Sequence, residues 1–222
     1  MRRTLLAFVL VMAGMAFSFR PEVAGTPWFW VGIGVPYLLL TALAVYKLWD
    51  DGTLIDVLEP RWGDLSIGVV SATVLLASSW AVRKLLVPEG TPRQGWLFQI
   101  YLQVGDPEHI QHSVLFTSLV VLIAVAEEIV WRGMVLTELS ERFGTRRGWP
   151  LTALLYGATA LPTIYTLSVP GAGVNPLLFI AALGCGIVWS FVASLSGRIP
   201  PVAFSHVAFT YFSLVVFRWP GM

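Results

Sequence analysis

Apolar residues run along the chain in long stretches separated by short polar ones, and the length of these stretches predicts membrane-spanning helices. Crossing about 30 Å of hydrocarbon takes roughly 17–25 helical residues. Stretches near this length lie at residues 4–19, 27–49, 65–82, 113–136, 150–167, 175–195 and 200–217. We therefore expect an all-α fold, a polytopic membrane helix bundle with about seven transmembrane helices.

The first stretch, residues 4–19, has two interpretations. It follows Arg2 and Arg3, as the short apolar core of a signal peptide would. However, the next residues are RPE (20–22), which is not the small-x-small pattern of a cleavage site. We therefore expect a retained first helix.

Composition places this chain in a lipid bilayer. It is 56% hydrophobic and only 12% charged, with a mean hydropathy of +0.75, whereas about a quarter of the residues of a soluble domain are charged. The net charge of +1 offers no electrostatic footprint for nucleic acid, so we expect no such partner. The single cysteine, Cys185, excludes an internal disulfide and a cysteine-based zinc site. We expect an integral membrane protein.

No repeat, low-complexity tract or soluble extension divides the chain, so we expect one structural unit. Within it, residues 1–64 would form N-terminal transmembrane helices and residues 65–222 the membrane domain that carries the chemistry. The polar stretch 88–112 contains WLFQIYLQV (96–104), which predicts a short helix at the membrane interface.

Three charges interrupt the fourth apolar stretch, in AVAEEIVWRGMV (124–135). On an α-helix Glu128 and Arg132 share a face, which predicts an ion pair. Glu127 is turned by about 100° from its neighbour and is not neutralised by the same geometry. An unpaired buried carboxylate is costly, so we interpret Glu127 as functional. In the alternative interpretation the span ends near Val125 and the charges lie among the headgroups.

His206 is the candidate partner of these carboxylates. It lies in PPVAFSHVAFTYF (200–212) and shares a helical face with Thr210. His109 and His112 lie in a polar stretch and are more typical of a solvated surface. A glutamate and a histidine are the smallest set that can activate water, because the carboxylate takes the proton while the imidazole orients the water or stabilises the oxyanion.

The segment EEIVWR (127–132) resembles the EExxxR motif of the CPBP intramembrane proteases, also called the CAAX-protease or Abi family and related to the Rce1-type prenyl-protein endopeptidases. The resemblance covers about residues 65–217, with its core at 113–212. A second pattern, SG-x-x-x-P-x-x-x-x-H, agrees with the family at a suitable spacing. Its residues are Ser196, Gly197, Pro201 and His206.

This resemblance implies an activity and a set of roles. It implies an intramembrane endopeptidase that cleaves a membrane-anchored protein or peptide, in a bacterial inner membrane. Glu127 would activate the water, and Glu128 with Arg132 would form its supporting pair. His206 would be the histidine of the final helix, while Thr210 stands where the family has an asparagine.

One family position departs more seriously from the pattern. Tyr156 stands at the aromatic position of YGATALP, but Ala160 replaces the histidine that the resemblance implies four residues later. This removes a water-orienting group, or a ligand if the family uses a metal. No cofactor is assured, and zinc is the one candidate, although two glutamates and one histidine make a poor zinc site. Water, Tyr156, Thr159 or Tyr165 could fill the gap.

Three functions remain open at this point. The first is a working intramembrane endopeptidase. The second is a catalytically silent relative that binds a membrane-tethered peptide as a chaperone, immunity factor or scaffold. The third is a transporter that uses Glu127 as a proton site, although transporters usually carry internal repeats, which this chain lacks. Replacing Glu127 by glutamine would leave the function of a silent binder intact.

Overall fold

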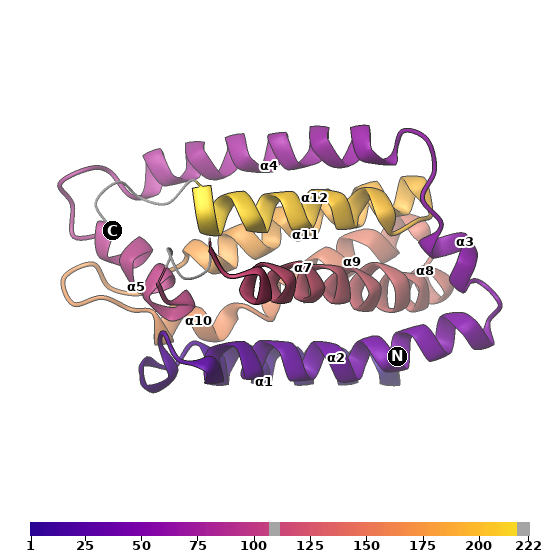
Figure 1. The fold of residues 1–222 in the computed structure, drawn as a ribbon, viewed down its shortest axis with the longest axis horizontal. Coiled ribbons are helices and arrows are strands. Elements are labelled where there is room, and N and C mark those ends of the chain that lie inside the picture. Colours follow the sequence, from indigo (N-terminus) through magenta and orange to yellow (C-terminus); the bar gives the residue numbers. More distant parts are fainter. Residues whose placement is uncertain (107–111, 217–222) are drawn as a thin grey trace.

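The computed structural model describes residues 1–106 and 112–216 and confirms an all-α fold, with no β-strand in these ranges (Figure 1). Two short segments, η2 and η3, are π-helical. The elements in chain order are α1 (Arg2–Ser18), η1 (Pro21–Val23), α2 (Pro27–Asp50), α3 (Leu54–Leu58), α4 (Asp64–Leu86), α5 (Gln94–Val104), α7 (Val114–Glu128), η2 (Ile129–Val135), α8 (Leu136–Phe143), α9 (Thr145–Ala158), α10 (Leu161–Thr166), α11 (Leu177–Ser196), α12 (Pro200–Tyr211) and η3 (Phe212–Val216).

Four helices of the described chain are long and apolar enough to cross a membrane: Pro27–Asp50, Asp64–Leu86, Val114–Phe143 and Leu177–Ser196. The predicted number of seven spans is therefore not confirmed. Helix α1 has 17 residues, the fifth stretch is broken between α9 and α10, and α12 has 12 residues before η3 begins. These shorter helices nevertheless lie alongside the long ones (Figure 1).

The break in the fifth stretch follows from local hydrogen bonds and a proline. The Thr159 hydroxyl donates to the carbonyl of Tyr156 at 2.6 Å, and the Thr163 hydroxyl donates to the carbonyl of Ala160 at 2.7 Å. Pro162 lies in the first turn of α10, where its missing N–H costs nothing. The chain can therefore end one helix and begin another at Thr159–Ala160.

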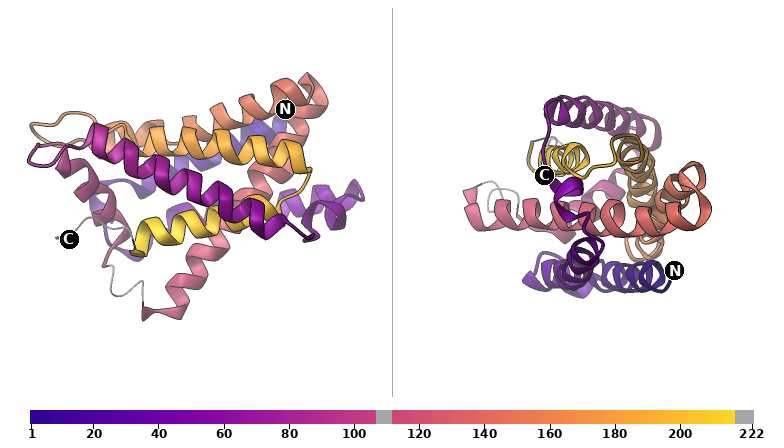
Figure 2. Two further views of the ribbon diagram at one scale, coloured as in Figure 1. Left: turned by 90° about the horizontal axis from the view of Figure 1, so that it is seen from above. Right: turned by 90° about the vertical axis from the view of Figure 1, so that its right-hand side faces the viewer.

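The bundle has α4 on one side and α1 with α2 on the other, while α7 and its continuation cross between them obliquely (Figures 1 and 2). Glycines allow the closest approaches. A Cβ on Gly68 of α4 would lie 2.7 Å from Cβ of Phe204 on α12, and one on Gly157 of α9 would lie 3.0 Å from Leu183 on α11. Small residues permit such close packing, which is the main source of helix association in a membrane.

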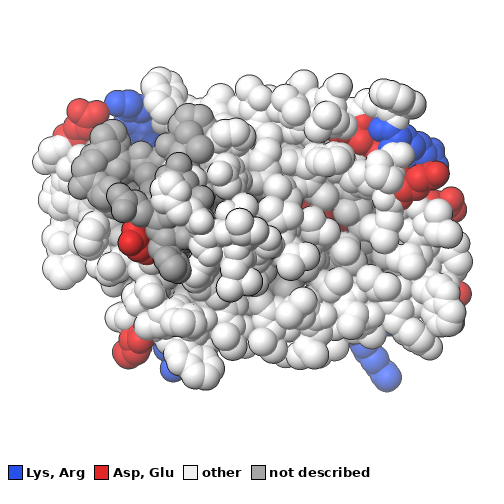
Figure 3. Space-filling view, viewed as in Figure 1, with Lys and Arg blue, Asp and Glu red and all other residues white. Residues whose placement is uncertain are grey.

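The core lies where η2 meets the surrounding helices. Val130, Trp131 and Met134 of η2 are completely buried, and they belong to one apolar cluster with Leu40 of α2 and Trp189 of α11. On the face shown in Figure 3, charged side chains gather towards the two ends and the middle is almost entirely free of them. This distribution suits an integral membrane protein, with an apolar band between charged ends.

Two further predictions concern the polar stretch before α7. The predicted short helix at WLFQIYLQV is present as part of α5. His112 is exposed and lies two residues before the start of α7, as expected of a surface residue, whereas His109 lies outside the described residues.

Candidate active site

The charged motif lies inside a continuous helix. Helix α7 ends at Glu128 and passes without interruption into the π-helical η2, which contains Arg132. The helix therefore does not end near Val125, and the candidate span Val114–Phe143 runs through the charged motif. A π-helical turn is wider than an α-helical one, and such turns occur frequently at functional sites.

Glu128 and Arg132 form the predicted ion pair. Arg132 Nη1 lies 3.1 Å from Glu128 Oε1, and both side chains are fully buried. The guanidinium also lies 4.6 Å from the ring centroid of Tyr156, within cation–π range. The second glutamate of the motif is thus neutralised inside the protein.

His206 joins this pair from α12. Its Nδ1 lies 2.6 Å from the same Oε1 of Glu128, so the imidazole carries its proton on Nδ1 when the carboxyl is ionised. The ring stacks on Trp189 of α11, with centroids 3.9 Å apart and planes inclined by 22°. Trp189 is itself held by a hydrogen bond from Nε1 to Ser205 Oγ at 3.0 Å. The imidazole is therefore held at Nδ1 by Glu128 and on one face by the Trp189 ring.

Glu127 lies in a different environment. Its side chain is half-buried, and Oε2 accepts a hydrogen bond from the Tyr156 hydroxyl at 3.0 Å. Glu127 lines a cavity of about 250 Å³ between the helices, whereas Glu128 does not. The two adjacent carboxylates are thus separated in environment, one facing open space and one enclosed, as the helical spacing predicted.

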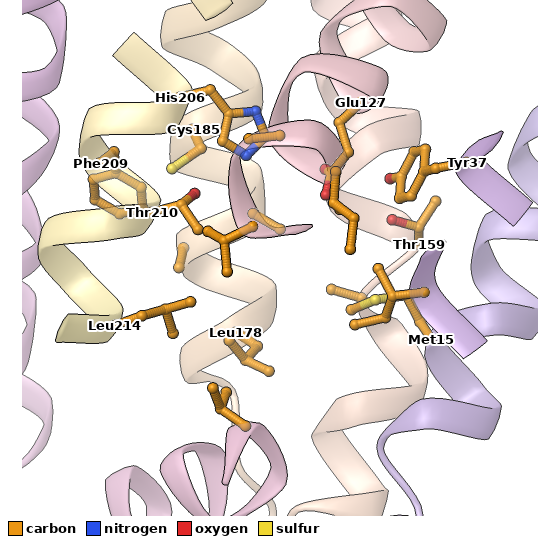
Figure 4. Close-up of a pocket in the computed structure, with 18 of the residues that line it drawn as sticks. Met15, Tyr37, Glu127, Thr159, Leu178, Cys185, His206, Phe209, Thr210 and Leu214 are labelled. Carbon is orange, nitrogen blue, oxygen red and sulfur yellow. The ribbon is translucent and has the colours of Figure 1, made fainter. Parts of the chain in front are cut away.

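The cavity combines a polar end with an apolar end. Glu127, His206 and Thr210 lie together at one end, and Met15, Leu178 and Leu214 lie towards the other (Figure 4). Such a space, mainly apolar with a few convergent polar groups, is typical of a ligand-binding site. Its side chains with polar atoms are Trp30, Tyr37, Glu127, Tyr156, Thr159, Cys185, Trp189, His206 and Thr210.

The structure therefore brings all five predicted site residues together, three on the cavity wall and two directly behind it. His206, predicted as the partner of the two carboxylates, makes its direct contact with Glu128. Ala160 also lines the cavity, so the departure from the family pattern lies at the site. Tyr165 is 72% exposed and is not part of the cavity lining, so the suggestion that it fills the gap is wrong.

Sequence reasoning missed Tyr37 and Trp189. Tyr37 comes from α2, lines the cavity and accepts a hydrogen bond from Trp131 Nε1 at 3.1 Å. A signal was present, because Tyr37 and Trp189 lie within long apolar helices, away from the helix ends where tyrosine and tryptophan usually meet the membrane interface. Polar-tipped aromatic residues at such positions need a partner inside the protein.

The side chains present do not fit a zinc site. In the ranges 1–106 and 112–216, no group of three or more His, Cys, Asp or Glu side chains is placed to hold a metal ion. Glu128 Oε1 is already engaged by Arg132 and by His206, and Ala160 supplies no ligand. We therefore derive no chemical step that passes through a metal.

Comparison with known proteins agrees with the geometry. Residues 110–212 match the family model described as Type II CAAX prenyl endopeptidase Rce1-like. Neither the comparison with curated proteins nor the comparison with solved structures gave a match. The matched segment contains the EExxxR motif and the histidine of α12. The resemblance inferred from the sequence is thus confirmed for residues 110–212, which are similar to the Rce1-like type II CAAX prenyl endopeptidases.

Proposed function

We propose that the chain is an intramembrane endopeptidase that hydrolyses a peptide bond of a membrane-anchored protein or peptide, in the inner membrane of a bacterium. One observation carries this proposal. Glu127 presents its carboxylate to a cavity that His206 and Thr210 also line, while the neighbouring Glu128 is neutralised behind the wall. A carboxylate that can accept a proton, in a cavity that also holds an imidazole and a hydroxyl, suits the hydrolysis of an acyl bond.

The proposed reaction uses side chains of this chain and one water. Glu127 accepts a proton from the water, whose oxygen attacks the carbonyl carbon of the scissile bond. Thr210 donates a hydrogen bond to the oxyanion that forms. Nε2 of His206 accepts a hydrogen bond from the water and orients it, because the imidazole proton lies on Nδ1, against Glu128. The C–N bond then breaks, and Glu127 returns its proton to the departing amine nitrogen. One well-placed oxyanion donor accelerates such a step by about 100- to 1000-fold.

The surrounding contacts preorganise these groups. Tyr156 holds Glu127 through Oε2, which leaves Oε1 for the water. Glu128 holds Nδ1 of His206, which leaves Nε2 as the ring nitrogen for the cavity. Since both side chains are fixed before substrate arrives, little reorganisation is required during the reaction.

The apolar part of the cavity favours an apolar substrate segment. Met15, Leu178 and Leu214 lie below the polar groups in Figure 4, and they can contact a chain end or a transmembrane tail while its peptide bond lies near Glu127. Burying apolar surface there contributes roughly 25 cal/mol per Å² to binding.

The proposal is tested by comparing protein termini in the membranes of a deletion strain. The strain is complemented with the wild type, Glu127→Ala or His206→Ala, and with two matched controls. The controls are Glu89→Ala, at a glutamate whose side chain is 72% exposed, and His112→Ala, at an exposed histidine. Quantitative mass spectrometry should find a processed terminus with the wild type and both controls. The proposal fails if Glu127→Ala and His206→Ala restore that terminus fully.

One observation favours a second candidate, a catalytically silent protein that binds a membrane-tethered peptide. Ala160 lines the cavity at the position where the family resemblance implies a histidine. A silent binder would keep its function in Glu127→Gln and would produce no processed terminus. Cleavage that appears only with Ala160→His would identify an enzyme that has lost one residue.

A further inference from the structure

The replacement of a histidine by Ala160 raises the question of which cavity residue can orient the attacking water. Several side-chain donors of the described cavity lining are already engaged. Thr159 donates to the Tyr156 carbonyl at 2.6 Å, and Tyr156 donates to Glu127 Oε2 at 3.0 Å. Trp189 donates to Ser205 on the far side of His206. None of these three protons is left for a water beside Glu127.

Tyr37 differs from them in the direction of its hydrogen bond. Its hydroxyl accepts a bond from Trp131 Nε1 at 3.1 Å, and an indole N–H can only donate. The Tyr37 hydroxyl can therefore donate its proton, and the Glu127 carboxylate is a hydrogen-bonding partner on that side, so the proton reaches Glu127 or a water beside it. The tyrosine is only 4% exposed and lines the cavity. In Figure 4 its hydroxyl points toward the Glu127 carboxylate, from the side opposite His206.

Trp131 fixes this orientation. It lies in η2, is completely buried and contacts Tyr156 edge-on, with ring centroids 5.5 Å apart. Trp131 thus holds both tyrosines that lie near Glu127, Tyr37 through a hydrogen bond and Tyr156 through its ring. The π-helical segment η2, through Trp131, consequently sets the position of Tyr37, which belongs to α2.

We propose that Tyr37 is a positioning residue that donates a hydrogen bond to the water activated by Glu127 and so serves in place of the histidine missing at Ala160. The water accepts from Tyr37 with one lone pair, gives its proton to Glu127 and attacks with its other lone pair. This inference rests on the proposed function. It also makes α2 part of the site, although α2 lies outside the matched residues 110–212.

The test removes the hydroxyl alone. Tyr37→Phe keeps the ring, and the matched control is Tyr46→Phe, at a tyrosine of the same helix that is 57% exposed. The readout is the rate at which the processed terminus appears after induction, normalised to folded protein in the membrane. We expect Tyr37→Phe to slow processing about 100-fold, as the loss of one preorganised donor does, and Tyr46→Phe to leave the rate unchanged.

A second variant separates positioning from structure. Adding Ala160→His to Tyr37→Phe should restore at least a tenth of the wild-type rate. A structural role for Tyr37 predicts no such rescue, so a slow variant that Ala160→His leaves slow overturns the inference. If Tyr37→Phe does not accumulate because it leaves Trp131 Nε1 without an acceptor, the pair Tyr37→Phe with Trp131→Phe removes both polar groups and is measured instead.

The failure of this inference can be distinguished from failure of the proposed function. If Glu127→Ala abolishes processing while Tyr37→Phe matches Tyr46→Phe, the endopeptidase stands and the role of Tyr37 is overturned. If Glu127→Ala processes at the wild-type rate, both proposals fall. Loss of processing in Tyr37→Phe, with rescue by Ala160→His, supports both.

Discussion

Removing one partner of the buried ion pair between Glu128 and Arg132 should be far more costly than breaking an exposed pair. Both side chains are fully buried, with Nη1 and Oε1 3.1 Å apart. Replacing Arg132 by methionine keeps much of its volume and removes the charge. The Glu128 carboxylate would then remain enclosed without its cation, and breaking a buried pair in this way typically costs 3–5 kcal/mol.

The contacts around Glu128 place the expected cost at the lower end of that range. His206 Nδ1 lies 2.6 Å from Oε1 and still supplies a hydrogen bond after Arg132 is gone. Against this, the methionine loses the cation–π contact with Tyr156, which is worth roughly 0.5–2 kcal/mol. We therefore expect Arg132→Met to lower the free energy of unfolding by about 3 kcal/mol.

The assay is reversible unfolding of the purified protein in mixed micelles with increasing denaturing detergent. Lys84 and Glu89 provide a matched control, because their charged atoms are also 3.1 Å apart while their side chains are 57% and 72% exposed. Lys84→Met should cost about 0–1 kcal/mol, as exposed pairs do. If Arg132→Met and Lys84→Met cost the same, burial does not decide the value of this pair and the reasoning is refuted.

Three further outcomes follow from the same geometry. Tyr156→Phe should slow processing about tenfold, because Glu127 loses a 3.0 Å hydrogen bond and is less well oriented; a rate equal to the wild type in the terminus assay would contradict this. Gly68→Ala should destabilise the bundle by about 1–2 kcal/mol, since its Cβ would lie 2.7 Å from Cβ of Phe204. Gly184→Ala should be neutral or stabilising, because a Cβ there meets no atom within 4 Å. Unfolding in detergent measures the stability of both variants. A zinc chelator should leave processing unchanged, because the described side chains do not form a three-ligand site; inhibition that added zinc reverses would contradict this.

The part of the site that sequence predicts best is the part set by local helical geometry. Glu128 and Arg132 are four residues apart, so any helical turn through this segment brings them close, and the structure confirms the pair. The separation of Glu127 from Glu128 follows from the same rotation per residue. The all-α fold likewise follows from composition and the length of the apolar stretches. These features require no knowledge of which helices become neighbours.

Features that depend on helix neighbours could not be read in this way. The partner of His206 proved to be Glu128, across 78 positions of sequence, and no spacing rule predicts such a contact. Tyr37 was missed for the same reason, because only packing of α2 against η2 brings its hydroxyl to Trp131. The break at Thr159–Ala160 was also missed, since an apolar run gives no sign that two threonine hydroxyls will bond to carbonyls of the preceding turn.

The two adjacent glutamates serve both the stability of the bundle and its proposed chemistry. Glu128 faces inward, where it holds Arg132 in its own helix and His206 on α12, so it fixes α12 against the helix that carries Glu127. The position of the imidazole relative to the Glu127 carboxylate, the proposed base, therefore depends on the charge of the next residue, Glu128. A single glutamate could not both accept a proton from water and hold the histidine by an ion pair. Two consecutive glutamates, pointing in different directions from one helix, allow the site to do both.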